Sequence, residues 1–156
     1  MLEDSEFITA LVLSVLSAII IGIEREFREK DAGINTHLFV IGGSMLFSYL
    51  SFVVEPSSTG RIAAQIVSGI GFIGAGLILK EGSNIKNLTT AASIWFAAGI
   101  GMAYGFGYYS VGIVSTLLAF FSPRIPDFRK KHGTNGNGLE HVEVQIPPKK
   151  INKRKK

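Results

Sequence analysis

The sequence predicts an all-α integral membrane protein, a bundle of about five transmembrane helices. The first observation is a run of 37 residues without a single charge, from residue 87 to residue 123. Three shorter uncharged stretches precede it, at residues 7–23, 32–54 and 62–79. A helix needs about 17 to 25 mostly apolar residues to cross the hydrocarbon core of a bilayer, so every one of these stretches is long enough.

The longest stretch is expected to hold two spans. As one helix at about 1.5 Å per residue it would reach about 55 Å, well beyond a hydrocarbon core of about 30 Å. Residues 105–109 offer the break, because two glycines permit a turn and the aromatic residues suit a membrane–water interface. The predicted spans are therefore residues 7–23, 34–54, 62–79, 88–105 and 108–122.

The basic residues predict the orientation of these spans. Three follow the first span, one lies between the second and third, two lie between the third and fourth, and ten lie from Arg124 onward. Lys and Arg near span ends gather on the cytoplasmic side. Five spans with the N-terminus outside place fifteen of the sixteen in the cytoplasm, whereas four spans would export the basic C-terminal end. We therefore expect a transmembrane domain at residues 1–123 and a flexible cytoplasmic tail at residues 124–156.

Composition narrows the class of function. The formal net charge of +4 comes almost wholly from the tail, which favours a topology determinant that also contacts anionic lipid over nucleic-acid binding. Without cysteine there is no disulfide, no thiolate nucleophile and no Cys-ligated zinc. Neither a nucleophile–base constellation nor a full metal-ligand set is visible in the sequence, so we expect no enzyme and no bound cofactor. The lipid bilayer is the first expected partner.

Charged residues follow the first span directly, and they are candidates for function. Glu24 and Arg28 are spaced i to i+4, with the carboxylate first as the helix dipole prefers, which would give a solvated, self-paired helix end. Alternatively, Glu24, Arg25 and Glu26 lie at the membrane edge, where an ionisable residue is a functional candidate. Carboxylates there would attract Mg²⁺ through the waters that this ion retains.

Polar residues also open the second and fourth spans. Thr36 and His37 enter the second span, where His37 is expected to be a polar anchor rather than a metal ligand. Thr89 and Thr90 enter the fourth span, where their hydroxyls would either line a polar pathway or bond to the helix backbone. The sequence leaves these alternatives open.

Two sets of small residues predict close helix packing. The third span formally contains a GxGxxG motif, but it follows no strand and lacks the acidic residue of a dinucleotide site. Small residues instead let helices approach within the membrane, or expose the backbone to a cavity. The second set lies on one face of the fourth span and would meet the third span or pair two chains into a homodimer. The two sets are Gly69, Gly71, Gly74 and Gly76, and Ala97, Gly101 and Gly105.

Four motifs together resemble the MgtC/SapB family in order and spacing. They are residues 21–26 (IGIERE), residues 32–37 (AGINTH), residues 69–76 (GIGFIGAG) and residues 88–95 (LTTAASIW). The resemblance covers about residues 10–122. In two respects we expect the chain to depart from it. Asn35 stands where the family usually has Arg, and we expect no soluble C-terminal domain like that of the MgtC branch, as in the shorter SapB type.

The resemblance implies a multi-pass protein of the prokaryotic inner membrane that is associated with growth under magnesium limitation. From it we expect a non-enzymatic protein that acts in or regulates magnesium homeostasis through contacts with a membrane-protein partner. The alternative is a transporter or channel for Mg²⁺, in which Glu24, Arg25, Glu26, Thr89 and Thr90 line the pathway.

Overall fold

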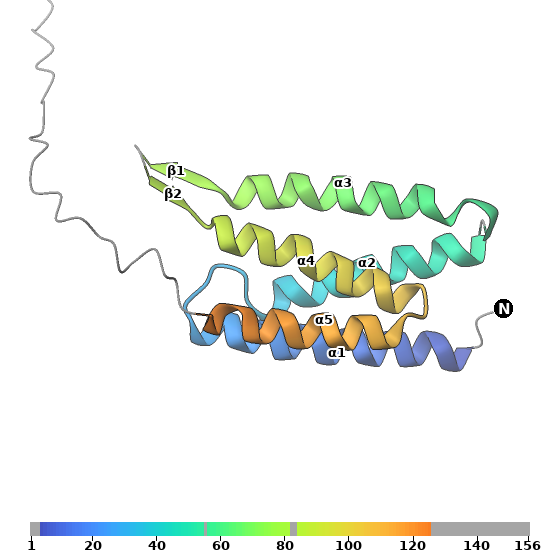
Figure 1. Cartoon of the computed structure of the whole chain (residues 1–156). Helices are drawn as coiled ribbons and strands as arrows, with labels where there is room; N and C mark the ends of the chain where they lie inside the picture. Colours follow the sequence, from blue (N-terminus) through green and yellow to red (C-terminus); the bar gives the residue numbers. More distant parts are fainter. Residues whose placement is uncertain (1–3, 55, 82–83, 126–156) are drawn as a thin grey trace, which may run out of the picture. The chain divides into compact units, whose positions relative to one another are not determined.

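The computed structural model describes residues 4–54, 56–81 and 84–125. This part of the chain is helical apart from one short hairpin, in agreement with the predicted all-α class. The predicted tail lies outside the described residues from Pro126 onward. The five helices are α1 (Asp4–Phe27), α2 (Ile34–Val54), α3 (Thr59–Leu77), α4 (Leu88–Gly105) and α5 (Tyr109–Phe121) (Figure 1).

Short elements connect the helices. A 3₁₀ turn, η1 (Pro56–Ser58), precedes α3, and a second, η2 (Ser122–Arg124), follows α5. Between α3 and α4 the chain forms an antiparallel hairpin of β1 (Leu79–Glu81) and β2 (Asn84–Lys86), which the sequence analysis did not predict. The long uncharged stretch of residues 87–123 is broken where the sequence predicts. Helix α4 ends at Gly105, and Gly107, with a φ of +81°, turns the chain.

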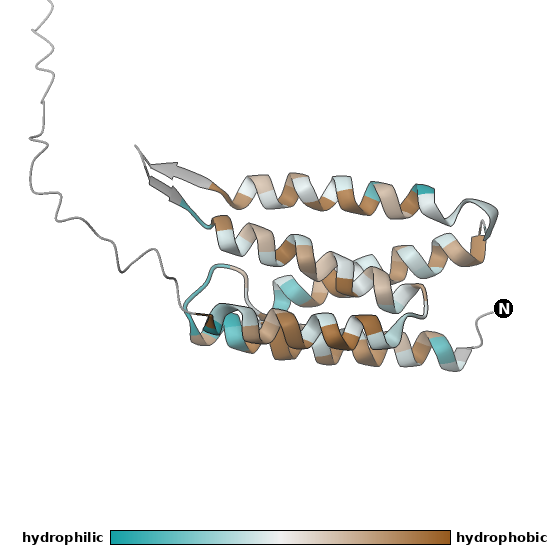
Figure 2. Cartoon of the chain, viewed as in Figure 1, coloured by the Kyte–Doolittle hydropathy of each residue, from teal (hydrophilic) through white to brown (hydrophobic). Residues whose placement is uncertain are grey.

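Three helical segments are long and apolar enough to cross a membrane: Ser5–Phe27, Ile34–Val54 and Pro56–Leu77. Figure 2 shows hydrophobic residues along all five helices. Many large apolar side chains face outward, and Phe72 and Phe39 are 85% and 77% exposed. Contiguous apolar surface of this extent is costly in water and favourable in lipid, so the chain is a membrane protein. The crossing of the membrane by α4 and α5, and the orientation of the termini, remain predictions.

The bundle is organised around α2 and α4, which share the most extensive contact between two helices. Helix α1 packs against α2 and α5. Helix α3 packs against α4 and α2 (Figure 1). Helices α1 and α2 are antiparallel, since Gly22 meets Ile34 at one end and the rings of Phe7 and Tyr49 lie 4.8 Å apart at the other. The largest fully buried apolar side chains are Ile21, Ile41, Met45, Ile94, Ile100 and Tyr104.

Two glycines of α4 set the distance between α2 and α4. A Cβ atom on Gly101 would stand 2.1 Å from the carbonyl oxygen of Ile41, and one on Gly105 would stand 2.3 Å from that of Met45. Both contacts are with backbone, which cannot rotate away. Gly101 and Gly105 therefore pack on α2 within the chain and not on α3, and Ala97, which belongs to the same set of small residues, is buried.

Candidate functional site

Most of the predicted polar residues lie at the corner where α1 ends and α2 begins: Glu24, Arg25, Glu26, Thr36 and His37. Two glycines allow this corner to close. A Cβ on Gly22 would lie 2.3 Å from the Cα of Ile34, and a Cβ on Gly33 would lie 2.4 Å from Oε1 of Glu26. The same carboxylate oxygen accepts a hydrogen bond of 3.0 Å from the backbone N–H of Ile34. Glu26 therefore caps α2 and satisfies one of its free N–H groups.

Glu24 and Arg25 form a buried ion pair beside this cap. Their side chains are 3% and 9% exposed, and Nε of Arg25 lies 3.6 Å from Oε2 of Glu24. Arg28, one turn further along α1, pairs with the other carboxylate oxygen of Glu24, as the i to i+4 spacing predicted. The carboxylate of Glu24 is thus held between two guanidinium groups.

His37 lies fully buried next to this ion pair. Its Nδ1 donates a hydrogen bond of 2.9 Å to the carbonyl of Gly33, one turn earlier in α2. Gly33 also packs against the carboxylate of Glu26, so His37 belongs to the same corner. With Nδ1–H committed to Gly33, Nε2 is left as an acceptor, and it has no hydrogen-bond partner among the described residues.

The threonines divide between the inside and the outside of the bundle. Thr90 is buried, Thr89 on the neighbouring position of α4 is exposed, and Thr36 is half-buried. Adjacent helix positions point about 100° apart, so Thr89 and Thr90 do not face a common space. The hydroxyl of Ser93, one turn further along α4, donates to the backbone carbonyl of Thr90 at 2.8 Å. Whether the hydroxyls of Thr89 and Thr90 line a polar pathway or bond to the backbone stays a prediction.

The glycines of α3 mostly face outward. A Cβ on Gly74 would meet the carbonyl oxygen of Ala91 in α4 at 3.7 Å, an ordinary packing distance. Gly69, Gly71 and Gly76 have no atom within 4 Å of the position that a Cβ would take. Of the four, only Gly74 therefore contributes to packing between the described helices.

A polar cluster that the sequence analysis did not identify lies deeper in the bundle. The hydroxyls of Ser17, Tyr104 and Thr116 come from α1, α4 and α5. Ser17 Oγ lies 2.8 Å from Tyr104 Oη and 2.9 Å from Thr116 Oγ1, and the Thr116 hydroxyl donates to the carbonyl of Gly112 at 2.8 Å. Gly112 is needed here, because its Cβ would lie 2.2 Å from the Tyr104 ring. The sequence feature that could have indicated this network is Tyr104, a tyrosine inside an apolar span.

We expect Tyr104→Phe to lower the free energy of unfolding by about 0.6 kcal/mol, the average measured for hydrogen bonds between membrane helices, and by no more than about 1.7 kcal/mol. Ser17 and Thr116 would keep their mutual bond, so the loss stays modest. Unfolding by denaturing detergent, followed by circular dichroism, measures the effect. Tyr108→Phe is the matched control, since Tyr108 is 64% exposed. If both changes have the same effect, the hydrogen bonds that Tyr104 makes with Ser17 and Thr116 add no stability.

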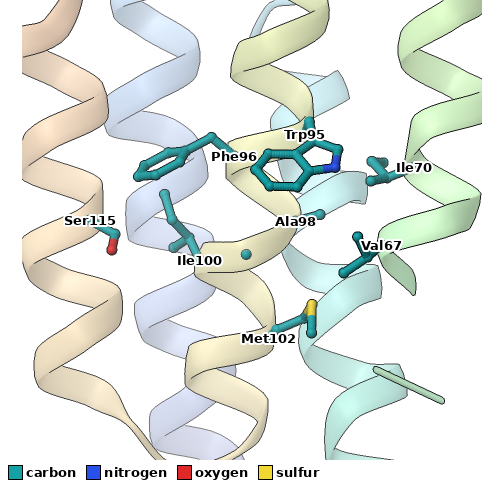
Figure 3. A pocket seen from close by; sticks show the side chains of 9 residues that line it. Val67, Ile70, Trp95, Phe96, Ala98, Ile100, Met102 and Ser115 are labelled. Carbon is teal, nitrogen blue, oxygen red and sulfur yellow. The ribbon is translucent and has the colours of Figure 1, made fainter. Parts of the chain in front are cut away.

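A small hollow of about 240 Å³ lies along α4 and is bordered by α3 on one side and α5 on the other, and Figure 3 shows the side chains that line it. Trp95 extends from α4 toward Ile70 of α3, while Phe96 turns toward α5, where Ser115 is the one hydroxyl in the lining. Trp95, which is 53% exposed, is therefore at the edge of this hollow and not sealed between helices. The lining is apolar and offers no ligands for a cation.

Among the residues that the structure describes, no group of three or more His, Cys, Asp or Glu side chains is placed to hold a metal ion. Of the functional candidates, Glu24, Arg25, Glu26 and His37 form one cluster at this corner, while the roles predicted for Thr36, Thr89 and Thr90 stay predictions. This cluster, together with the outward apolar surface, defines the class: a helical membrane protein whose buried charges are grouped at one end of the bundle.

The chain belongs to the MgtC family, whose sequence profile matches residues 11–127. Protein MgtC of Salmonella typhimurium strain LT2 is 44% identical over 112 residues, which are 72% of this chain and 48% of the relative. A protein of Escherichia coli strain K12 named "Putative magnesium transporter YhiD" is 44% identical over 126 residues, covering 73% of this chain and 57% of that protein.

Protein MgtC of Brucella abortus is 48% identical over 100 residues, covering 64% of this chain and 42% of that protein. The chain thus spans about half the length of the curated relatives that it matches. No solved structure gives a significant match.

Proposed function

We propose that this protein regulates magnesium homeostasis from the prokaryotic inner membrane, without enzymatic activity, through contacts with membrane-protein partners. Its membership of the MgtC family and its similarity to a protein named for magnesium transport support the link to magnesium. The choice of regulation over transport depends on one observation, the position of Glu24 between Arg25 and Arg28.

Glu24 is the one buried carboxylate among the described residues, and two guanidinium groups already neutralise it. The two guanidinium groups outnumber the Glu24 carboxylate, so Glu24 offers a divalent cation no uncompensated negative charge. A buried carboxylate on a Mg²⁺ pathway would need its charge available to the ion. The arrangement is better suited to fixing the corner between α1 and α2 than to passing a cation.

The surface of α3 supports action through helix contacts. Of the three segments that are long enough to span the membrane, the one containing α3 has the smallest buried share, 11%. Gly71 and Ala75, four residues apart, are both exposed on it. Small residues at this spacing let another helix approach closely in a membrane.

Magnesium flux in liposomes tests the proposal. We expect the purified protein, reconstituted with a Mg²⁺-sensitive dye inside, to give no more Mg²⁺ entry than protein-free liposomes. A Mg²⁺ ionophore serves as the positive control for the dye. Robust uptake by the unmodified protein would contradict the proposal. Loss of that uptake in Glu24→Gln, with circular dichroism and a melting curve showing the variant to be folded in the liposomes, and with the exposed Glu29→Gln unaffected, would place Glu24 on the pathway.

A further inference from the structure

A hollow of about 530 Å³ lies between α2 and α3. Its walls are apolar, with Phe39, Val40 and Phe47 on α2 and Ile62, Ile66 and Ile73 on α3. Ser44 and Gln65 are the only polar side chains in the lining. The groove is therefore suited to an apolar occupant with a polar group near Gln65.

Two glycines create the depth of this groove. Gly43 on α2 and Gly69 on α3 both line it, and neither has an atom within 4 Å of where its Cβ would stand. A larger residue at either position would fill the space without meeting backbone. The groove therefore exists because these two positions lack side chains, and not because a steric clash holds α2 and α3 apart.

The polar residues along α3 have an informative order. Arg61 lies in the first turn of α3, Gln65 lies one turn further in, and Gly69 and Ile73 follow in the apolar part of the groove. At about 1.5 Å per residue, Gln65 lies about 9 Å beyond the start of the helix. Passing inward from the membrane surface, α3 therefore presents a cation, then a hydrogen-bonding amide, then an apolar channel.

We propose that this groove, defined by Gly43, Phe47, Gln65, Gly69 and Ile73, binds an anionic phospholipid, with one acyl chain between α2 and α3. A phospholipid presents phosphate, ester carbonyls and hydrocarbon in the same order as Arg61, Gln65 and the apolar lining. Arginine is well matched to phosphate oxygens. The Gln65 amide, which is exposed within an apolar helix, gains a hydrogen-bond acceptor that the hydrocarbon cannot supply.

The size of the groove is compatible with a lipid chain. A volume of about 530 Å³ falls within the range of about 300–1,000 Å³ typical of small-molecule sites. The proposal is independent of whether the protein regulates or transports, because it concerns a different face from the corner cluster.

Lipid retention in native mass spectrometry tests the proposal. The full-length protein, delipidated in detergent, is titrated with phosphatidylglycerol, phosphatidylcholine or diacylglycerol. We expect phosphatidylglycerol to be retained most strongly, and Gly69→Leu to lower its retention about tenfold, which corresponds to about 1.4 kcal/mol. Gly71→Leu is the matched control, since Gly71 is equally open on α3 but does not line the groove. We expect it to retain the lipid normally.

Arg61→Gln separates the headgroup from the acyl chain. We expect it to reduce the preference for phosphatidylglycerol over diacylglycerol while the retention of diacylglycerol stays unchanged. Equal lipid retention by Gly69→Leu and Gly71→Leu would overturn the proposal. So would a shift from dimer to monomer in Gly69→Leu without loss of lipid, because the groove would then be an interface between copies of the chain. Melting temperatures of both leucine variants confirm that they fold.

Discussion

Replacing Gly101 by leucine should disrupt the bundle more than any conservative change in its core. A Cβ at this position would stand 2.1 Å from the Ile41 carbonyl oxygen and 2.9 Å from the Cβ of Ser44. Overpacking a core against movable side chains costs about 1–3 kcal/mol. Here the obstacle is backbone, so α2 and α4 must separate, and we expect a loss of more than about 3 kcal/mol in the free energy of unfolding.

Two controls separate this clash from the general effect of adding a leucine. Gly99 lies two residues away on α4, is exposed and has no atom within 4 Å of its Cβ position, so Gly99→Leu should change stability by less than about 0.5 kcal/mol. Ile100→Leu keeps the volume of a fully buried side chain and should cost less than about 1.5 kcal/mol. Thermal unfolding in a mild detergent measures all three. Equal melting temperatures for Gly101→Leu and Gly99→Leu would rule out the close approach of α2 and α4.

The second large effect is expected at Glu24. Glu24→Gln removes the carboxylate that pairs with Arg25, whose side chain is only 9% exposed. Breaking one partner of a buried ion pair costs about 3–5 kcal/mol, because the remaining charge stays buried without compensation. Arg28→Met should cost about 1 kcal/mol or less, since the Arg28 side chain is 40% exposed and water screens its charge.

A double substitution tests whether the cost comes from the uncompensated charge. In Glu24→Leu/Arg25→Met both buried charges are gone, and apolar side chains of similar volume often replace such a pair without loss. We therefore expect the double variant to be more stable than Glu24→Gln, by about 2 kcal/mol or more. Chemical unfolding in detergent provides the comparison. If the double variant is less stable than Glu24→Gln, the pair has a structural role beyond charge compensation.

Much of the helical architecture could be read from the sequence because the membrane imposes simple constraints. A polypeptide in hydrocarbon must satisfy its backbone hydrogen bonds internally, so uncharged stretches of sufficient length become helices. The break at residues 105–109 was also predictable, because the 37-residue uncharged stretch is too long to cross the membrane as one helix. The i to i+4 pairing of Glu24 with Arg28 follows from helix geometry alone and is also present.

The partners of the individual side chains were less predictable. The glycine face of α4 was expected to meet the third span or another chain, but it packs on α2. The spacing of small residues reveals that a helix approaches but carries no information about which helix it is. Likewise, the glycines of α3 share one sequence motif, yet only Gly74 faces another described helix.

The sequence by itself determined the class of protein, the helices and the location of the charges, because hydrophobic length and charge spacing act locally along the chain. Only the tertiary structure decided that Glu26 caps α2, that His37 is fully buried beside Glu24 and Arg25, and that Ser17, Tyr104 and Thr116 share hydrogen bonds. These contacts join residues that are 8 to 99 positions apart. Their formation depends on which helix faces pack together, and that is a property of the whole bundle.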